Sequence, residues 1–180
     1  MRKIYETERL LLKTSDISFG KMAANYYLRN RSFLEEWEPG RDDTFYTREY
    51  QQSQLKEDQS SGNSLRLWVF KKGDESRIIG SLAFSSIVRG AFLSCFLGYK
   101  LDETEINQGY MTEAIQKGIE IMFHEFGLHR IEANIMPKNK RSLRVAEKLG
   151  FYNEGTARKY LKINGVWEDH IHMVLLNDRV

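Results

Sequence analysis

The sequence has few of the features that mark an exported or membrane-inserted protein. It contains one cysteine, Cys95, so no disulfide can form within the chain, which suits a reducing compartment. No run approaches the roughly 20 apolar residues that a membrane-spanning helix needs. The basic start is followed by Glu6, Glu8 and Arg9, where a signal peptide requires apolar residues. We therefore expect a cytoplasmic protein without a membrane contact.

Proline and an excess of charge of one sign are also scarce. The 180 residues include only two prolines and are 41% hydrophobic, which excludes a disordered chain and predicts a single domain spanning 1–180. The 27 basic and 25 acidic residues leave a net charge of +2. With so balanced a charge we expect no direct binding to nucleic acid.

Hydrophobic patterning in the first half of the chain predicts helices mixed with strands. A strand is expected over 4–14, followed by an amphipathic helix. Phe33, Leu34 and Trp37 are spaced for one face of a short helix, and 44–60 reads as a largely solvated helix. Apolar runs separated by turn residues then predict antiparallel strands over 65–70, 78–87 and 91–101.

The second half of the chain predicts a strand–helix–strand unit and a hairpin. From Gly109 the apolar period changes from two to 3.6, which indicates a helix that ends at Gly127. Because a strand over 129–136 follows, this strand and the strand before the helix should be parallel neighbours. Asn139 opens another helix, and Asn164-Gly165 predicts a type I′ turn between strands over 151–163 and 166–176.

His170 and His172 share one face of the last predicted strand, because they are two residues apart. Two histidines at this spacing can bind a metal, but no third ligand is in view. We interpret them as a solvated strand face and expect no metal site.

The stretch from Phe96 to Ala114 is the first candidate for a binding site. It consists of a strand, FLGYKLD, a loop and the sequence NQGYMTEA, which opens a helix. A glycine-containing turn that leads into a helix points backbone N–H groups at one spot, at the positive end of the helix dipole. Such a spot binds phosphate, although a plain strand-to-helix turn remains an alternative.

The second candidate is NKRSLRVAEKLGFYNEG, residues 139–155. Asn139 can be explained as the residue that caps the helix. Ser142 then falls at the third helical position, where a capping box uses Glu or Gln. Local helix chemistry therefore does not require this serine, and a functional role is the alternative.

Together these stretches resemble the GCN5-related N-acetyltransferase (GNAT) superfamily, and Gly-Tyr-x-Thr-Glu-Ala resembles its RimJ/RimL-type branch, which acetylates the N-termini of ribosomal proteins. The second stretch resembles the family signature Asn-x-x-Ser…Lys-x-Gly-Phe-x-x-Glu-Gly. Ile106 and Met111 depart from the family turn, which has Gln or Arg and Gly or Ala there. The resemblance implies an α/β (α+β) fold with a mixed, mostly antiparallel central sheet that is splayed near its middle and flanked by helices.

The resemblance also implies site residues for transfer of acetyl from acetyl-CoA to an amine, without a metal. Ser142 would contact the thiol and supply or relay its proton, and Trp37 would form a wall of the acceptor site. Some relatives carry a glutamate where this chain has Asn134, which leaves Glu132 as a general base acting through water, or as a surface carboxylate paired with an arginine. The implied cofactor-binding residues are Tyr99, Leu101, Asn107, Gln108, Gly109, Tyr110, Met111, Thr112, Asn139 and Ser142.

The acceptor follows from the pKa of the amine. A free α-amine has a pKa near 8, so about a tenth is neutral at physiological pH, whereas a lysine side chain is neutral about once in a thousand. A protein N-terminus, such as that of a ribosomal protein, is thus the preferred acceptor, and Glu35, Glu36 and Glu38 beside Trp37 would favour a cation. The alternatives are a small-molecule amine (polyamine, amino sugar or aminoacyl nucleotide) and a non-catalytic CoA-binding module.

Overall fold

The fold is built on one sheet, seen in a computed structural model that describes residues 3–180. The strand order is β1-β2-β3-β4-β5-β6-β8-β7. Each neighbouring pair is antiparallel except β5 and β6, which are parallel as the sequence predicts. The strands are β1 (Ile4–Glu6), β2 (Leu10–Thr14), β3 (Leu65–Lys71), β4 (Gly80–Val88), β5 (Ser94–Leu101), β6 (Arg130–Ile135), β7 (Tyr152–Ile163) and β8 (Val166–Leu176).

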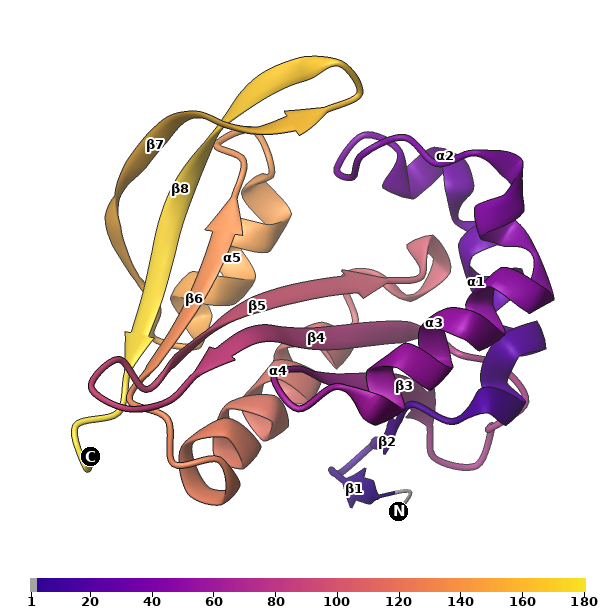
Figure 1. Cartoon of the computed structure of the whole chain (residues 1–180), viewed down its shortest axis with the longest axis horizontal. Helices are drawn as coiled ribbons and strands as arrows, with labels where there is room; N and C mark the ends of the chain where they lie inside the picture. The colour runs from indigo at the N-terminus through magenta and orange to yellow at the C-terminus, as the bar shows by residue number, and fades with distance from the viewer. Residues whose placement is uncertain (1–2) are drawn as a thin grey trace.

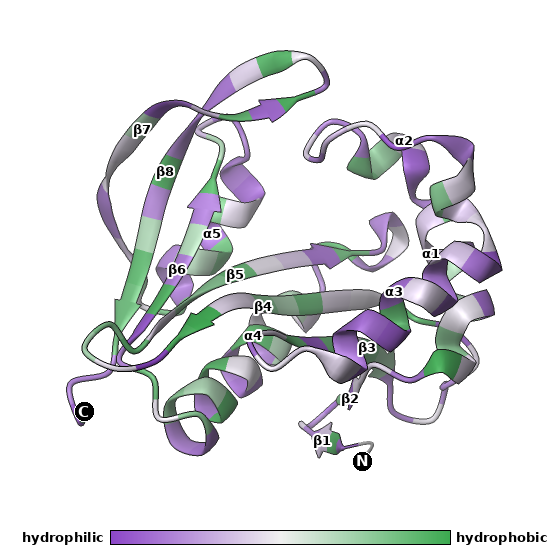
Figure 2. Ribbon diagram, viewed as in Figure 1, coloured by the Kyte–Doolittle hydropathy of each residue, from purple (hydrophilic) through white to green (hydrophobic). Residues whose placement is uncertain are grey.

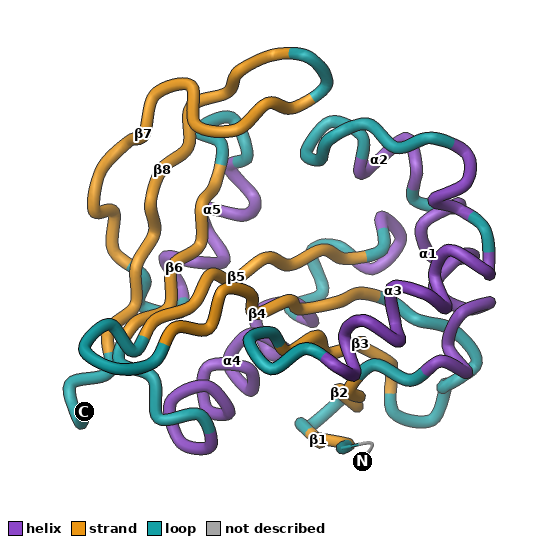
Figure 3. Tube along the Cα trace, viewed as in Figure 1, coloured by secondary structure: helices purple, strands orange, loops and turns teal. Residues whose placement is uncertain are grey.

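Helices cover both faces of this sheet (Figure 3). The alternation in β3 explains why. Leu67 and Val69 join the core beneath α4 (Tyr110–Glu120), while Trp68 and Phe70 belong to a second cluster beneath α1 (Gly20–Arg29) and α3 (Arg48–Ser60). The helical elements are η1 (Ile17–Phe19), α1 (Gly20–Arg29), α2 (Arg31–Leu34), η2 (Asp43–Tyr46), α3 (Arg48–Ser60), η3 (Glu103–Glu105), α4 (Tyr110–Glu120), the π-helical η4 (Ile121–Glu125) and α5 (Lys140–Lys148).

The sheet splits between β5 and β6, which confirms the expected splay. The two strands pair only at their beginnings, where Ser94 to Phe96 face Arg130 to Glu132. Beyond this point β5 runs away from β6, and the two arms open like a V (Figure 1). The remaining residues of each strand thus border the opening instead of pairing with each other.

Hydropathy follows these layers. The inner strands are largely green or pale in Figure 2, whereas α3 on the outside is mostly purple. Only Gln51 and Leu55 of α3 are buried, in agreement with the predicted solvated helix. Within residues 3–180, no helix is both long and apolar enough to cross a bilayer.

Two predicted elements are divided in the structure. The strand expected over 4–14 is a hairpin of β1 and β2, because the backbone and hydroxyl of Thr7 bind Leu10 and close a turn. The helix expected within 44–60 begins as a 3₁₀ turn and restarts at α3, where the Thr47 hydroxyl accepts from the N–H of Tyr50 and caps the new helix. Both breaks arise from threonine hydroxyls that compete for backbone N–H groups.

The predicted hairpin turn is confirmed. Asn164 and Gly165 have φ values of +48° and +84° between β7 and β8, as a type I′ turn requires. The predicted cap is confirmed as well, since the Asn139 side chain accepts from the N–H of Ser142 at the start of α5.

Candidate functional site

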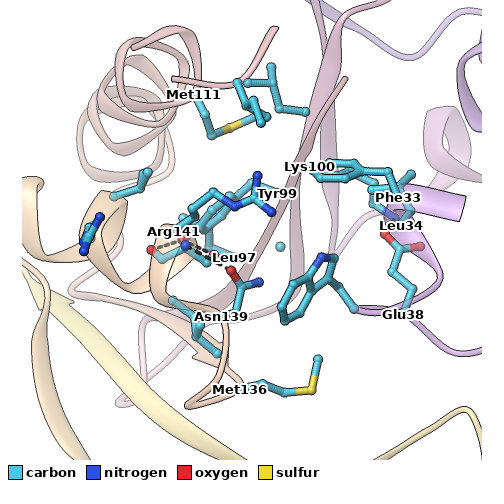
Figure 4. Close-up of a pocket in the computed structure, with 18 of the residues that line it drawn as sticks. Phe33, Leu34, Glu38, Leu97, Tyr99, Lys100, Met111, Met136, Asn139 and Arg141 are labelled. Atoms are coloured by element: carbon cyan, nitrogen blue, oxygen red, sulfur yellow. Dashed lines mark hydrogen bonds and ion pairs between the residues drawn. The ribbon is translucent and has the colours of Figure 1, made fainter. Parts of the chain in front are cut away.

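A cavity of about 650 Å³ lies where the two arms of the sheet separate. Figure 4 shows Phe33, Leu34 and Glu38 on one side of it, and on the other Arg141 of α5 and Asn139, which caps that helix. Residues of β5 lie between these two sides. The cavity brings together most of the residues singled out in the sequence, namely Trp37, Tyr99, Leu101, Asn107, Gly109, Tyr110, Met111, Thr112, Asn134, Asn139 and Ser142.

The turn that opens α4 has the geometry of an anion site. Asn107 and Gly109 lie in the left-handed region, with φ values of +61° and +80°. No side chain caps α4, so the first N–H groups of the helix are left for a ligand. Left-handed residues followed by a helix N-terminus form a concave set of N–H donors that suits a phosphate. The residues present therefore fit the phosphorylated end of CoA.

Arg9 braces this turn from the start of β2. Its Nε lies 2.7 Å from Oε2 of Glu113, and its Nη1 donates to the carbonyl of Gln108 at 2.9 Å. Burial opposes the ionised form of Glu113, but hydrogen bonds from Thr7 and Arg9 hold the pKa of this carboxyl below its usual value. The side chain of Gln108 binds Glu105 instead of lining the cavity. Sequence reasoning missed this brace, because Arg9 and Glu113 are 104 positions apart.

A buried ionic cluster supports the loop before the turn. Asp102 and Glu105 are only 1% and 2% exposed. Asp102 accepts from Arg29 at 2.6 Å, Glu105 binds Lys71 at 2.7 Å, and Arg77 pairs with both carboxylates. Breaking such a pair leaves an uncompensated buried charge, so the cluster ties the loop firmly to α1 and β3.

Ser142 and Tyr99 join α5 to β5 across the split. The Ser142 hydroxyl donates to the Tyr99 phenol oxygen at 2.8 Å, and the phenol donates to the Ser142 carbonyl at 2.9 Å. Burial raises the pKa of Tyr99 to about 12, although the bond from Ser142 acts in the opposite direction. The phenol thus stays protonated at neutral pH and holds the serine at the cavity wall.

Trp37, in the segment after α2, and Asn134, on β6, also line the cavity. The Oδ1 atom of Asn134 is buried and has no hydrogen-bond partner among residues 3–180. A buried acceptor without a partner is costly, so this atom suits an N–H group of a bound molecule. Beside Trp37, Glu38 pairs with Lys100 and Glu35 pairs with Arg31. These ion pairs reduce the negative field that the sequence suggests there.

Glu132 does not line the cavity. It is 8% exposed, with Oε1 2.6 Å from Nδ1 of His172 and Oε2 2.7 Å from Arg130. Bonds to Glu154 and Glu132 outweigh burial and raise the pKa of Arg130. The pairing with an arginine was one of the two alternatives for Glu132. Both carboxylate oxygens are thus occupied.

The expectation that His170 and His172 form a solvated face is wrong. His170 is 4% exposed, and His172 is held by Glu132. The reason is tertiary, because Tyr160 of β7 packs its ring 5.6 Å from the ring of His170 and 5.1 Å from that of His172. Within residues 3–180 no cluster of possible metal ligands is found.

The tip of the β7–β8 hairpin contacts the segment after α2 that contributes Trp37, Glu38 and Pro39 to the cavity. The Asn164 amide donates to the carbonyl of Glu35, just beyond α2. A Cβ on Gly40 would lie 3.2 Å from the Asn164 side chain, so the two segments touch closely. The tip of the β7–β8 hairpin and the loop after α2 therefore meet at the open end of the V (Figure 1).

A sheet splayed beside a helix-opening turn defines the fold class of the N-acetyltransferases. The chain belongs to the GNAT acetyltransferases, because the model of the acetyltransferase (GNAT) domain matches residues 9–152. It is 39% identical over 168 residues to the ribosomal protein uS5-alanine N-acetyltransferase of Escherichia coli, covering 92% of this chain and 86% of that one.

Solved structures agree. The ribosomal-protein-S5-alanine acetyltransferase of Vibrio fischeri superposes with a TM-score of 0.91 at 38% identity, covering 98% of this chain and 97% of that one. Mycobacterium smegmatis RimJ in complex with CoA-disulfide gives a TM-score of 0.91 at 24% identity, covering 100% and 89%, which supports the fold alone. The protein is an N-acetyltransferase of GNAT type with RimJ/RimL relatives.

Proposed function

We propose that this enzyme transfers acetyl from acetyl-CoA to the N-terminal α-amine of a protein, with a ribosomal protein as the preferred class of acceptor. The observation that carries the proposal is the uncapped, left-handed turn at Gly109, which opens onto the same cavity as Ser142 and Trp37. The activity of the E. coli relative supports the acceptor class, and membership of the GNAT acetyltransferases supports acetyl-CoA as the donor.

Positive side chains support an anionic donor. Arg141, Arg144 and Lys148 of α5 are spaced to share one helix face, and they line the same cavity as the turn that opens α4. The turn would hold the pyrophosphate through backbone N–H groups, and these cations would add electrostatic attraction.

Direct transfer in a ternary complex is the chemistry that the site supports. The lone cysteine, Cys95, is buried in the core, and burial raises the pKa of its thiol to about 12, so it is unsuited to carry the acetyl group. The amine nitrogen attacks the thioester carbon, the N–C bond forms and the C–S bond breaks. One proton passes from the nitrogen to solvent. The departing thiolate takes one through the Ser142 hydroxyl, which turns from Tyr99 toward the sulfur and regains a proton from solvent.

An amine panel tests the function. Thiol release from acetyl-CoA would be measured with a peptide that begins with alanine, the same peptide blocked at its N-terminus but carrying a lysine, a polyamine, an amino sugar and an aminoacyl nucleotide. We expect release with the free N-terminus and an acetyl group on the α-nitrogen by mass spectrometry. Turnover of a small amine alone would contradict the acceptor class. CoA binding without turnover of any amine would support the non-catalytic alternative.

A further inference from the structure

His170 lines the cavity, but the acetyl transfer described above gives its side chain no role. It lies on β8, is 4% exposed and lines the cavity. Its Nδ1 lies 3.1 Å from the carbonyl oxygen of Glu168. A carbonyl can only accept a hydrogen bond, so Nδ1 carries the hydrogen and the lone pair of the neutral ring is on Nε2.

The strand register places His170 beside the predicted acceptor site. Asn134 of β6 pairs with His172 of β8, so His170 is the diagonal neighbour of Asn134 on the same face. Such neighbours lie about 7–8 Å apart in antiparallel strands. Among residues 3–180, Nδ1 is the only side-chain atom of His170 for which a hydrogen-bond partner is found. A basic nitrogen and the unpartnered oxygen of Asn134 thus face one space.

The groups around His170 hold the ring in place. Tyr160 of β7 packs against it with ring centroids 5.6 Å apart. The charged groups nearby are paired, because Glu168 binds Lys138 at 2.9 Å and His172 binds Glu132 of β6 at 2.6 Å. The ring is therefore oriented by packing and by a hydrogen bond to a carbonyl.

We infer that His170 is the general base that removes the proton from the attacking amine, an inference that rests on the proposed function. As the nitrogen forms its bond to the acetyl carbon and the C–S bond breaks, the excess proton on nitrogen passes to Nε2 of His170. The thiolate takes its proton through the Ser142 hydroxyl, which regains one from solvent, and His170 returns its proton to solvent after the acetylated product leaves. No oxidant, metal or further reactant is needed.

His170 fits this role better than Glu132. Glu132 lies outside the cavity lining with both oxygens bonded to His172 and Arg130. A base must come within about 3 Å of the proton that it removes, directly or through one water. Only His170 of these two lines the space where the amine would lie.

The test is His170→Gln, with His129→Gln as its matched control. His129 also has its Nδ1 3.1 Å from a backbone carbonyl, that of Asn177, but it lies outside the cavity lining. At pH 7 we expect kcat/KM for the amine to fall about 10²-fold in His170→Gln, with the KM for acetyl-CoA unchanged. In a plot of kcat/KM against pH, the acidic limb of His170→Gln should show one ionisation fewer than that of the wild type. The ionisation that remains should be that of the amine substrate. His129→Gln should keep the rate and the profile.

Two further measurements separate the possible failures. Added imidazole should restore part of the activity of His170→Ala, which a merely structural loss would not allow. Nitrogen NMR of the wild-type protein should find His170 with hydrogen on Nδ1, and hydrogen on Nε2 alone would overturn the inference even if the variants do not fold. If the wild type acetylates an amine and His170→Gln has unchanged kinetics, His170 is not the general base, but the proposed function stands. If the wild type acetylates no amine, both the proposed function and the role of His170 are refuted.

Discussion

Replacing Gly109 by valine tests the turn that opens α4. Gly109 has a φ of +80°, and an L-residue in this region costs roughly 1–2 kcal/mol, more when it is β-branched. A Cβ would also lie 3.3 Å from Nη2 of Arg9 and press on the brace of the turn. If the turn adopts another conformation to relieve this strain, the fraction of the protein that can bind CoA falls about 5–30-fold. The Kd for CoA should rise by the same factor.

Gly73 supplies the matched control, because its φ of +81° is nearly the same and nothing lies within 4 Å of its expected Cβ. Gly73→Val should lower the melting temperature by about 2–8 °C, from 1–2 kcal/mol of strain in a chain of this length. Its affinity for CoA should not change. Isothermal titration calorimetry checks both variants. An unchanged Kd for CoA in a folded Gly109→Val protein would refute the assignment of the turn.

Two predictions concern the reacting groups. Ser142→Ala should lower kcat by up to about 10²-fold and change the KM for acetyl-CoA little. The loss should be no larger, because a thiol of pKa about 8.5 is already a tolerable leaving group. An unchanged kcat with a raised KM would make Ser142 a binding residue only. Trp37→Ala should raise the KM for the amine about tenfold or more without changing that for acetyl-CoA. A lower melting temperature without a selective effect on the amine would instead assign Trp37 to the core.

The cofactor side of the site could be predicted from the sequence because its signals are local. The change of period at Gly109 and the Asn139 cap each depend on residues within a few positions of one another. The parallel pairing of β5 and β6 follows from the crossover rule without knowledge of the packing. These elements bring Asn107, Tyr99 and Ser142 to one cavity.

The remaining parts of the site depend on contacts between distant segments. The Arg9–Glu113 brace and the carboxylates of Asp102 and Glu105 read as ordinary surface charges in the sequence. The same holds for His170, since an alternating strand gives no sign that Tyr160 of the neighbouring strand covers it. Periodicity shows which residues share a face, but it does not show which segment packs against that face.

The donor side and the acceptor side of the cavity also differ in how many ion pairs and hydrogen bonds hold them in place. Buried ion pairs at Asp102 and Glu105 and the Arg9 brace fix the turn at Gly109, so its N–H groups are set before any ligand arrives. The acceptor rim, formed by the loop after α2 and the hairpin tip, has fewer such contacts, namely the hydrogen bond from the Asn164 amide to the Glu35 carbonyl and the ion pair of Glu38 with Lys100. Because the donor site is fixed by its own contacts, residues of the acceptor rim can be substituted without disturbing the donor site. Acceptor selectivity should therefore respond to substitutions near Trp37 that leave the affinity for CoA unaltered.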